Sequence, residues 1–353
     1  MIQISSGQRF LALDALRGVA AWWVVYFHVL GGMGYLAVDF FLVLSGFILT
    51  HRYWYADQAV STLTFINHRI ARLYPLHVLT LLVFTLVHWL MYRVMPDFPD
   101  GTLFTFLQNL TMTHNIGLNP HGLTWNYPSW SVSVEFFVNI LFIVMITRQT
   151  RSSVLFLLAT LSFIMLFIHH GNLNIHNENE YGFINGGLVR GMASFMLGIV
   201  AYRLYRYYRD DSRLTRFGTV LEIVCVVIAL ALVWSYPTRP ASLDVFVPYI
   251  AVFMVALFAL ESGWISQQLR RLSYLGDISY SVYLNHLVVI MVLRHLALKN
   301  GMTPETIFVL TAVIVLVYSH FTHFYWEIPA GKAMRKGLQW LTTPQPRADA
   351  LRD

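Results

Sequence analysis

The sequence predicts an all-α polytopic membrane protein with about ten transmembrane helices and both termini in the cytosol. Three observations predict this fold. First, 57% of the residues are hydrophobic and only 12% are charged, whereas a soluble domain has about twice that share of charge. Second, apolar stretches recur along the whole chain. Third, lysine and arginine are concentrated in alternate connecting segments.

Ten apolar stretches approach the roughly 20 residues that a helix needs to cross a bilayer. They are residues 11–30, 36–51, 73–92, 130–147, 153–169, 186–202, 217–235, 245–261, 278–298 and 305–325. The first carries Asp14 and Arg17 and is not followed by a small-residue cleavage site. We therefore expect a retained helix rather than a signal peptide. The second is short and contains Asp39.

The distribution of lysine and arginine predicts the orientation. With a cytosolic N-terminus, eighteen of the 24 basic residues fall on the inside, three outside and three within spans. Cytosolic loops of membrane proteins carry this excess of positive charge. The same distribution explains the net charge of +6 without a nucleic-acid partner. The only cysteine, Cys225, excludes a disulfide framework.

Three further segments complete the organisation. The longest outer loop, 93–129, contains an amphipathic piece at 103–112 that we expect at the membrane interface. The loop 172–185 is polar. We expect one transmembrane domain over residues 1–340 and a disordered cytosolic tail over residues 341–353.

Arg17 and His28 are the most informative pair. They are eleven residues apart, which returns the helix to within about 20° of the same face after a rise of about 16 Å. Ionisable residues inside a membrane are costly and mark functional sites. An imidazole can take a proton from a hydroxyl group and return it. The alternative is a structural histidine bonded to the backbone.

Acidic residues near the outer side are candidate partners of this histidine. Glu135 follows Ser131 by four residues, on the same helix face. It could orient His28 as the acid of a catalytic triad does, or pair with Arg190. Asp39 opens the second span and could act as a helix cap.

Two arginines stand at the cytosolic entrance of the third span. Arg69 and Arg72 are three residues apart and share a helix face, which suits the binding of a phosphate. The alternative is ordinary anchoring by positive charge. Asp14 and Arg17 have the same spacing and could simply pair.

The sequence gives no sign of a metal site or a serine nucleophile. His320 and His323 share a helix face, but no acidic or cysteine ligand stands beside them. No Gly-x-Ser-x-Gly sequence occurs. We expect no metal and no tightly bound cofactor.

Six segments, in this order, resemble the membrane-bound acyltransferase family 3. They are Arg17 with His28, Val38–Phe47, Arg69-Ile-Ala-Arg72, Ser129–Glu135 (Trp-Ser-x-Ser-x-Glu), Ile278–His286 and Glu327–Pro329. The resemblance extends from Phe10 to about Pro329. Two departures are Phe136, where many members have a second acid, and the Glu-Ile-Pro sequence, where a Glu-Arg-Pro-like motif is usual.

The resemblance implies transfer of an acyl group, commonly acetyl, from acyl-CoA to a hydroxyl of a glycan or glycolipid of the cell envelope. It implies that His28 is catalytic and that Arg69, Arg72 and Arg17 attend the donor. We expect Glu135 to assist His28. The residues expected to support the site or bind the acceptor are Asp14, Asp39, Ser129, Trp130, Ser131, Arg190 and His286. A standalone enzyme in the cytoplasmic membrane, without a fused SGNH-type hydrolase domain, is expected.

Two other classes of function remain open. A transporter or flippase of a lipid-linked glycan would also have ten spans with buried charges, but would not depend on CoA. A membrane sensor without catalysis would tolerate replacement of Arg69 and Arg72.

Overall fold

A computed structural model describes residues 9–54, 61–118, 123–147, 149–176, 178–180 and 184–342 of the chain. Within these residues, ten helical stretches are long and apolar enough to cross a membrane. The only strands among them are the two residues each of a small antiparallel hairpin. The predicted all-α polytopic fold and the predicted number of spans are confirmed.

The main helices follow one another with short connections. They are α1 (Leu11–Leu30), α2 (Ala37–Leu49), α3 (Thr62–Tyr92), α4 (Thr102–Leu110), α5 (Trp130–Thr147), α6 (Ser152–His170), α7 (Gly186–Tyr208), α8 (Ser212–Trp234), α9 (Val247–Phe258), α10 (Trp264–Leu269), α11 (Ser273–Asp277), α12 (Ser279–Asn300), α13 (Pro304–Thr322) and α14 (Ile328–Thr342). Strands β1 (Asn179–Glu180) and β2 (Ile184–Asn185) pair before α7.

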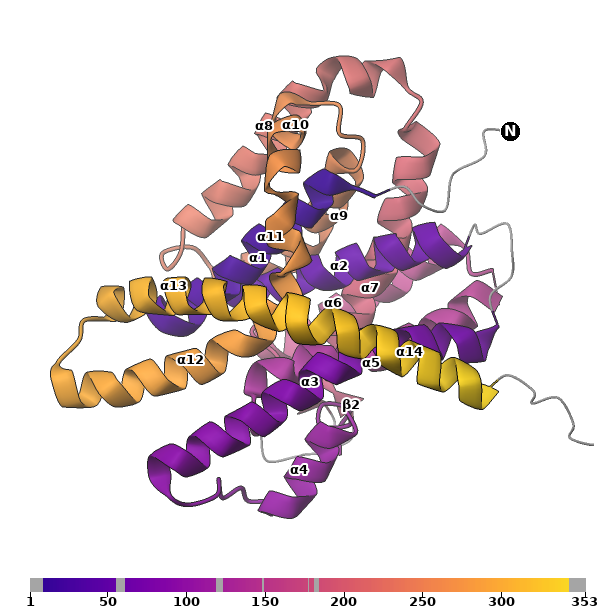
Figure 1. Ribbon diagram of the computed structural model, residues 1–353. Coiled ribbons are helices and arrows are strands. Elements are labelled where there is room, and N and C mark those ends of the chain that lie inside the picture. Colours follow the sequence, from indigo (N-terminus) through magenta and orange to yellow (C-terminus); the bar gives the residue numbers. More distant parts are fainter. Residues whose placement is uncertain are drawn as a thin grey trace, which may run out of the picture.

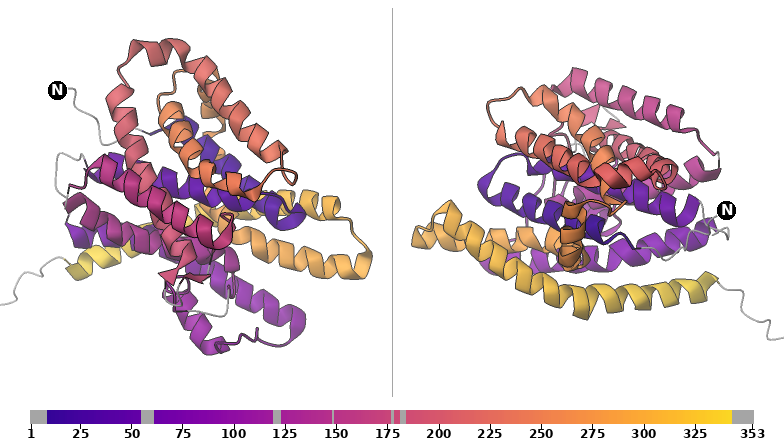
Figure 2. Two further views of the ribbon diagram at one scale, coloured as in Figure 1. Left: turned by 180° about the vertical axis from the view of Figure 1, so that it is seen from behind. Right: turned by 90° about the horizontal axis from the view of Figure 1, so that it is seen from above.

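Short 3₁₀ and π turns connect or extend these helices. The 3₁₀ turns are η1 (Gly34–Leu36), η3 (Tyr127–Ser129), η4 (Ala241–Phe246) and η5 (Arg270–Leu272), and the π turns are η2 (Thr50–Trp54) and η6 (His323–Glu327). Isolated π turns within helices are frequent at functional sites. Turn η6 joins α13 to α14 in one continuous run, which Figure 2 shows as a long curved rod along one edge of the bundle.

The third helix differs from its prediction. It begins at Thr62 rather than near residue 73, because the Ser61 hydroxyl accepts a hydrogen bond from the Thr64 N–H and caps the first turn. Its 31 residues correspond to about 46 Å, more than the ~30 Å of a hydrocarbon core. Arg69 and Arg72 therefore lie inside the helix, near its beginning.

The connecting segments agree in part with expectation. The amphipathic piece at 103–112 forms helix α4, whose outer face exposes Leu103 while Thr105 and Asn109 are fully buried. One face thus packs on the protein. Of the expected tail, residues 341–342 belong to α14, and residues 343–353 lie outside the described residues.

Helices α12 and α13 run in opposite directions and are joined by a turn (Figure 1). Figure 1 shows the turn between α12 and α13 at the left, and the end of α14 at the right. Helix α1 begins away from the α12–α13 turn and runs toward it. We call the end where α1 begins the basic end, because Arg9, Arg17 and Arg72 gather there.

Close backbone approach fixes α2 against α7. A Cβ atom added to Gly46 would lie 2.3 Å from the Phe195 carbonyl oxygen, and one added to Gly198 would lie 2.1 Å from the Val43 carbonyl oxygen. Small residues at such crossings let membrane helices pack backbone to backbone. This crossing holds α2, with Asp39 and Ser45, at a fixed distance from α7.

We predict that Gly46→Ala lowers thermal stability, because the added methyl group clashes with backbone on α7. Overpacking of this kind costs about 1–3 kcal/mol. Gly337→Ala on α14 is the matched control, since no atom lies within 4 Å of its added Cβ, and it should leave stability unchanged or slightly raised. The measurement is thermal unfolding of the detergent-purified proteins. Equal melting temperatures for the two variants would contradict this packing.

Candidate active site

His28 lies beside a second histidine near the end of α1. Its Nδ1 atom is 3.0 Å from Nε2 of His286 on α12 and 3.1 Å from the carbonyl oxygen of Val24. The ring centroids of the two histidines are 4.8 Å apart. His286 is completely buried. The structure therefore brings together two histidines that are 258 residues apart in sequence.

Aromatic side chains and one arginine surround this pair. The ring of Tyr127 is 5.5 Å from that of His28, and the ring of Tyr283 is 5.9 Å from that of His286. Arg294 donates a hydrogen bond to the backbone carbonyl of His28. The two histidines thus lie in a largely apolar aromatic setting with a positive charge nearby.

One side of α12 carries polar groups from this pair to the basic end. Ser279, Tyr283 and His286 recur at intervals of four and three, which places them on one helix face. Tyr280, one residue after Ser279, donates to the carbonyl oxygen of Leu73 on α3. Helix α12 therefore provides a continuous polar face along the interior of the bundle.

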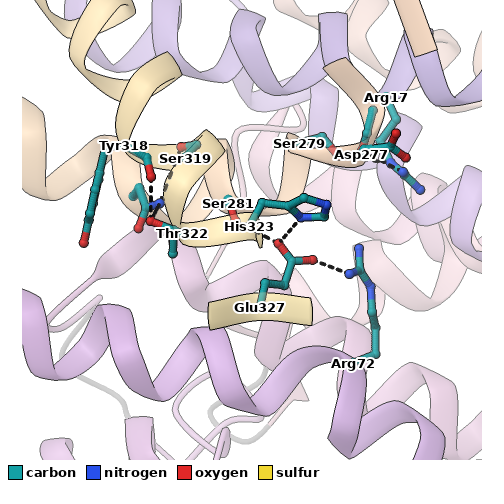
Figure 3. Close-up of polar contacts among 12 residues, drawn as sticks. Arg17, Arg72, Asp277, Ser279, Ser281, Tyr318, Ser319, Thr322, His323 and Glu327 are labelled. Atoms are coloured by element: carbon teal, nitrogen blue, oxygen red, sulfur yellow. Dashed lines mark hydrogen bonds and ion pairs between the residues drawn. The ribbon is translucent and has the colours of Figure 1, made fainter. Parts of the chain in front are cut away.

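At the basic end, a buried carboxylate holds Arg72. Glu327, in the π turn η6, forms an ion pair with Arg72 of α3 and accepts hydrogen bonds from Ser281 and His323 at 2.8 and 2.9 Å. The guanidinium of Arg72 also lies over the ring of Tyr280. Figure 3 shows Arg72 reaching toward Glu327 from the opposite element. The side chain of Arg72 is 39% exposed, which leaves it accessible to a ligand.

Arg17 lies next to this cluster and is anchored on α1, α11 and α12. Its guanidinium pairs with Asp14 at 3.0 Å and donates to the Gly276 carbonyl and the Ser279 hydroxyl. Arg9 also bonds to Asp14. The expected pairing of Asp14 with Arg17 is therefore present, and Figure 3 shows Arg17 beside Ser279.

Arg69 differs from the neighbouring arginines. Its Nε atom is buried and has no hydrogen-bond partner, and no carboxylate among the described residues forms an ion pair with it. Leaving a buried charged group without a partner is costly. Arg69 as a whole is half-buried, and its Nε is one of several buried polar atoms without a hydrogen-bond partner in the described part of the chain.

Glu135 does not contact His28. Its carboxylate accepts a hydrogen bond from Ser45 of α2 at 3.1 Å and acts electrostatically on Arg69 and Arg72. The expected orientation of His28 by Glu135 is thus corrected, because the carboxylate faces the basic end and His286 occupies the contact. A catalytic part for Glu135 stays a prediction.

Asp39 and Arg190 form a buried ion pair. Both Nε and Nη2 of Arg190 donate to Asp39, at 3.1 and 2.6 Å, and Ser194 adds a third donor. Neither side chain is more than 1% exposed. The guanidinium also lies 6.0 Å from the centre of the Trp130 ring. Two alternatives were wrong: Asp39 does not cap α2, and Arg190 does not pair with Glu135.

The serines around Trp130 connect the start of α5 to its neighbours. Ser129 bonds to His114 at 3.1 Å, and Ser131 bonds to the hydroxyl of Tyr283 at 2.7 Å. Burial lowers the pKa of His114, which lies in the loop between α4 and α5, to about 3, so this ring is neutral at pH 7. These serines hold the loop and α12 in place beside the histidine pair.

Four site residues were missed as participants by sequence reasoning. Tyr280, Tyr283 and Glu327 occurred only within quoted family signatures, and His323 was considered only as a metal ligand. The four-and-three spacing of polar residues on α12 was the available signal. Contacts between side chains on helices that are distant in sequence leave no pattern within a single stretch of the chain.

The comparison with known families agrees with this geometry. The acyltransferase domain of family 3 matches residues 10–321, which is nearly the whole chain. The chain belongs to the acyltransferase 3 family. This match includes both ends of the polar face, from Arg17 and Arg69 to the histidine pair.

Several curated proteins are similar to this family member. "Protein 2 in picA locus" of Rhizobium radiobacter is 31% identical over 182 residues, which are 46% of this chain and 95% of that protein. A Staphylococcus aureus protein named "Putative O-acetyltransferase" is 22% identical over 95% of this chain. An acyltransferase of Streptomyces mycarofaciens is 34% identical over 30% of this chain and 26% of its own length.

The share of its own length over which each relative aligns with this chain differs. The alignment with this chain covers 59% of the staphylococcal protein. No solved structure matches this member of the acyltransferase 3 family.

We predict that Asp39→Ala strongly destabilises this acyltransferase-family fold, because Arg190 is left as an uncompensated buried charge. Breaking such a pair from one side costs about 3–5 kcal/mol. The control is Asp210→Ala, which removes an ion pair whose carboxylate is 73% exposed and should change stability by less than about 0.5 kcal/mol. Thermal unfolding in detergent measures both. A mild effect of Asp39→Ala would show that the pair is not needed.

Proposed function

We propose that this protein transfers an acyl group, most simply acetyl, from cytosolic acyl-CoA to a hydroxyl of a cell-envelope glycan presented from the outside. The observation that carries the proposal is the polar face of α12. It connects the basic end, where the buried Nε of Arg69 has no hydrogen-bond partner, with the pair formed by His28 and His286. Family membership supports the reaction class.

The basic end suits the anionic part of acyl-CoA. Arg69 has no partner for its buried Nε, and Arg72 is partly exposed although it is held by Glu327. Guanidinium groups bind phosphates with several parallel hydrogen bonds. Because cytosolic segments carry the excess of basic residues, we place this end on the cytosolic side, where acyl-CoA is made.

The distance to the histidine pair suits the extended arm of the donor. Eleven residues of α1 separate Arg17 from His28, a rise of about 16 Å. The pantetheine arm is of the same order. A donor held by its phosphates at the basic end would therefore bring its thioester near His28.

The reaction needs one group that accepts and returns a proton. Nε2 of His28 takes the proton of the acceptor hydroxyl, and the oxygen attacks the thioester carbonyl. The carbon–sulfur bond then breaks, and the CoA thiolate leaves and takes the proton from His28. The products are the ester and CoA-SH. In the other route, Nε2 attacks the thioester first and forms an acyl-imidazole, which would release one equivalent of CoA before acceptor is added.

We predict that His28→Ala abolishes acyl transfer while the protein still inserts and folds. The measurement is release of CoA thiol and of labelled acetyl groups from acetyl-CoA, with membrane glycan extract as acceptor. His88→Ala is the control, because this histidine bonds to the Val94 carbonyl away from the polar face and should leave activity unchanged. Normal turnover by His28→Ala would contradict the mechanism. A transporter of lipid-linked glycans would release no CoA even in its wild-type form.

We predict that Arg69→Ala raises the KM for acetyl-CoA by about tenfold to hundredfold, since a charge-assisted hydrogen bond contributes about 1.5–3 kcal/mol. The kcat should change much less, because Arg69 is remote from the reacting atoms. Arg151→Ala is the matched control, as an exposed arginine that precedes α6 on the same predicted side. An unchanged KM in Arg69→Ala would place the donor elsewhere.

A further inference from the structure

We propose that His286 is the positioning residue that, together with the Val24 carbonyl, fixes the tautomer of His28 and that shares its proton during transfer. This inference rests on the proposed function, since it concerns how His28 acts as a base. It assigns to a second histidine the task that the sequence had suggested for Glu135.

The backbone determines which nitrogen of each ring carries the proton. Nδ1 of His286 faces the Val282 carbonyl oxygen at 3.3 Å, and Nδ1 of His28 faces the Val24 carbonyl oxygen at 3.1 Å. A carbonyl oxygen only accepts hydrogen bonds. Each Nδ1 is therefore the protonated nitrogen of its neutral ring.

The contact between the rings requires the same assignment. With its proton on Nδ1, His286 keeps a lone pair on Nε2, which accepts from Nδ1–H of His28 at 3.0 Å. In the opposite assignment, the lone pair of each Nδ1 would face a carbonyl lone pair. Three contacts thus select one arrangement: the Nδ1–H of His28 is shared between the Val24 carbonyl and Nε2 of His286, and Nδ1–H of His286 donates to the Val282 carbonyl.

This arrangement leaves Nε2 of His28 able to accept a proton. Nε2 of His28 keeps its lone pair, as a base that accepts a hydroxyl proton must. When His28 becomes an imidazolium, its Nδ1–H already points at Nε2 of His286, which can take part of the proton. In a Ser-His-Asp triad the acid has this position. Here the partner is neutral.

A neutral partner is suited to this location. Among the described residues no carboxylate hydrogen-bonds to either ring. An isolated buried carboxylate would be expensive to desolvate, whereas a buried imidazole with both nitrogens bonded is not.

The groups facing the pair contribute no competing acid. They are Tyr127 from η3, Tyr283 and Arg294 from α12, and His176, which acts electrostatically on His28. Of these, Arg294 is always positive. Its charge opposes an imidazolium at His28, so sharing the proton with His286 moves charge away from the ring nearest to the substrate.

Two substitutions of similar size separate the roles of His286. His286→Leu removes one of the two acceptors of Nδ1–H, so the Val24 carbonyl alone holds the tautomer of His28 and the proton is not shared. His286→Gln keeps an amide oxygen that can accept from Nδ1–H but cannot take up a proton. Asn285→Ala is the matched control: it alters a buried neighbour on α12 that bonds to Ser319 and Thr322 of α13.

We expect kcat to fall in the order wild type, His286→Gln, His286→Leu, with a total loss of about 10²- to 10⁴-fold, the range of a general base. The KM for acetyl-CoA should stay within about threefold in each variant, because the donor phosphates bind at the other end. Asn285→Ala should keep near wild-type kcat. A structural role for His286 would instead lower stability without distinguishing glutamine from leucine.

Equal kcat values for His286→Gln and His286→Leu, or a wild-type kcat in His286→Leu, would overturn the inference. If His286→Leu does not fold, ¹⁵N NMR of histidine-labelled wild-type protein decides, with His28→Gln used to assign the signals. A protonated Nδ1 and bare Nε2 at His28 support the inference, and the reverse overturns it. Failure of the proposed function is separate, because it would appear as activity in His28→Ala.

Discussion

The cost of placing charged and polar groups in an apolar interior governs this structure. Each such group must find a partner within the protein, because lipid supplies none. Asp39 with Arg190, and Glu327 with Arg72, obey this constraint through ion pairs and additional hydrogen bonds. Arg69 does not, since its buried Nε has no protein partner. In the proposed function, this nitrogen is available to the anionic donor.

Helix α12 connects the polar groups at the basic end with the histidine pair. Its serines and tyrosines contact α3, α5 and the π turn η6, and its His286 contacts α1. The two ends of the proposed reaction, phosphate binding and proton transfer, are thus positioned by one rigid element. Close helix crossings such as that at Gly46 and Gly198 keep the surrounding helices in register with it.

Much of the fold and part of the site could be predicted from the sequence. Hydropathy located all ten spans, and the spacing of Arg17 and His28 placed them correctly on one helix, because both properties are local along the chain. The start of α3 was missed, since its polar first turns around Arg69 do not contribute to an apolar window. The partners of Glu135, Asp39 and His286 could not be derived, because each lies on a helix that is distant in sequence. Which acid meets which base depends on how helices pack, and single-sequence patterns do not encode it.

In the proposed reaction, the donor binds at the basic end on the cytosolic side while transfer occurs beside His28. Labelled acetyl-CoA, which does not cross membranes, can be supplied to sealed vesicles of expressing cells in either orientation. We expect label in the glycan fraction of inverted vesicles, where the cytosolic face is exposed, and none in right-side-out vesicles or with His28→Ala. Equal labelling in right-side-out vesicles would contradict it.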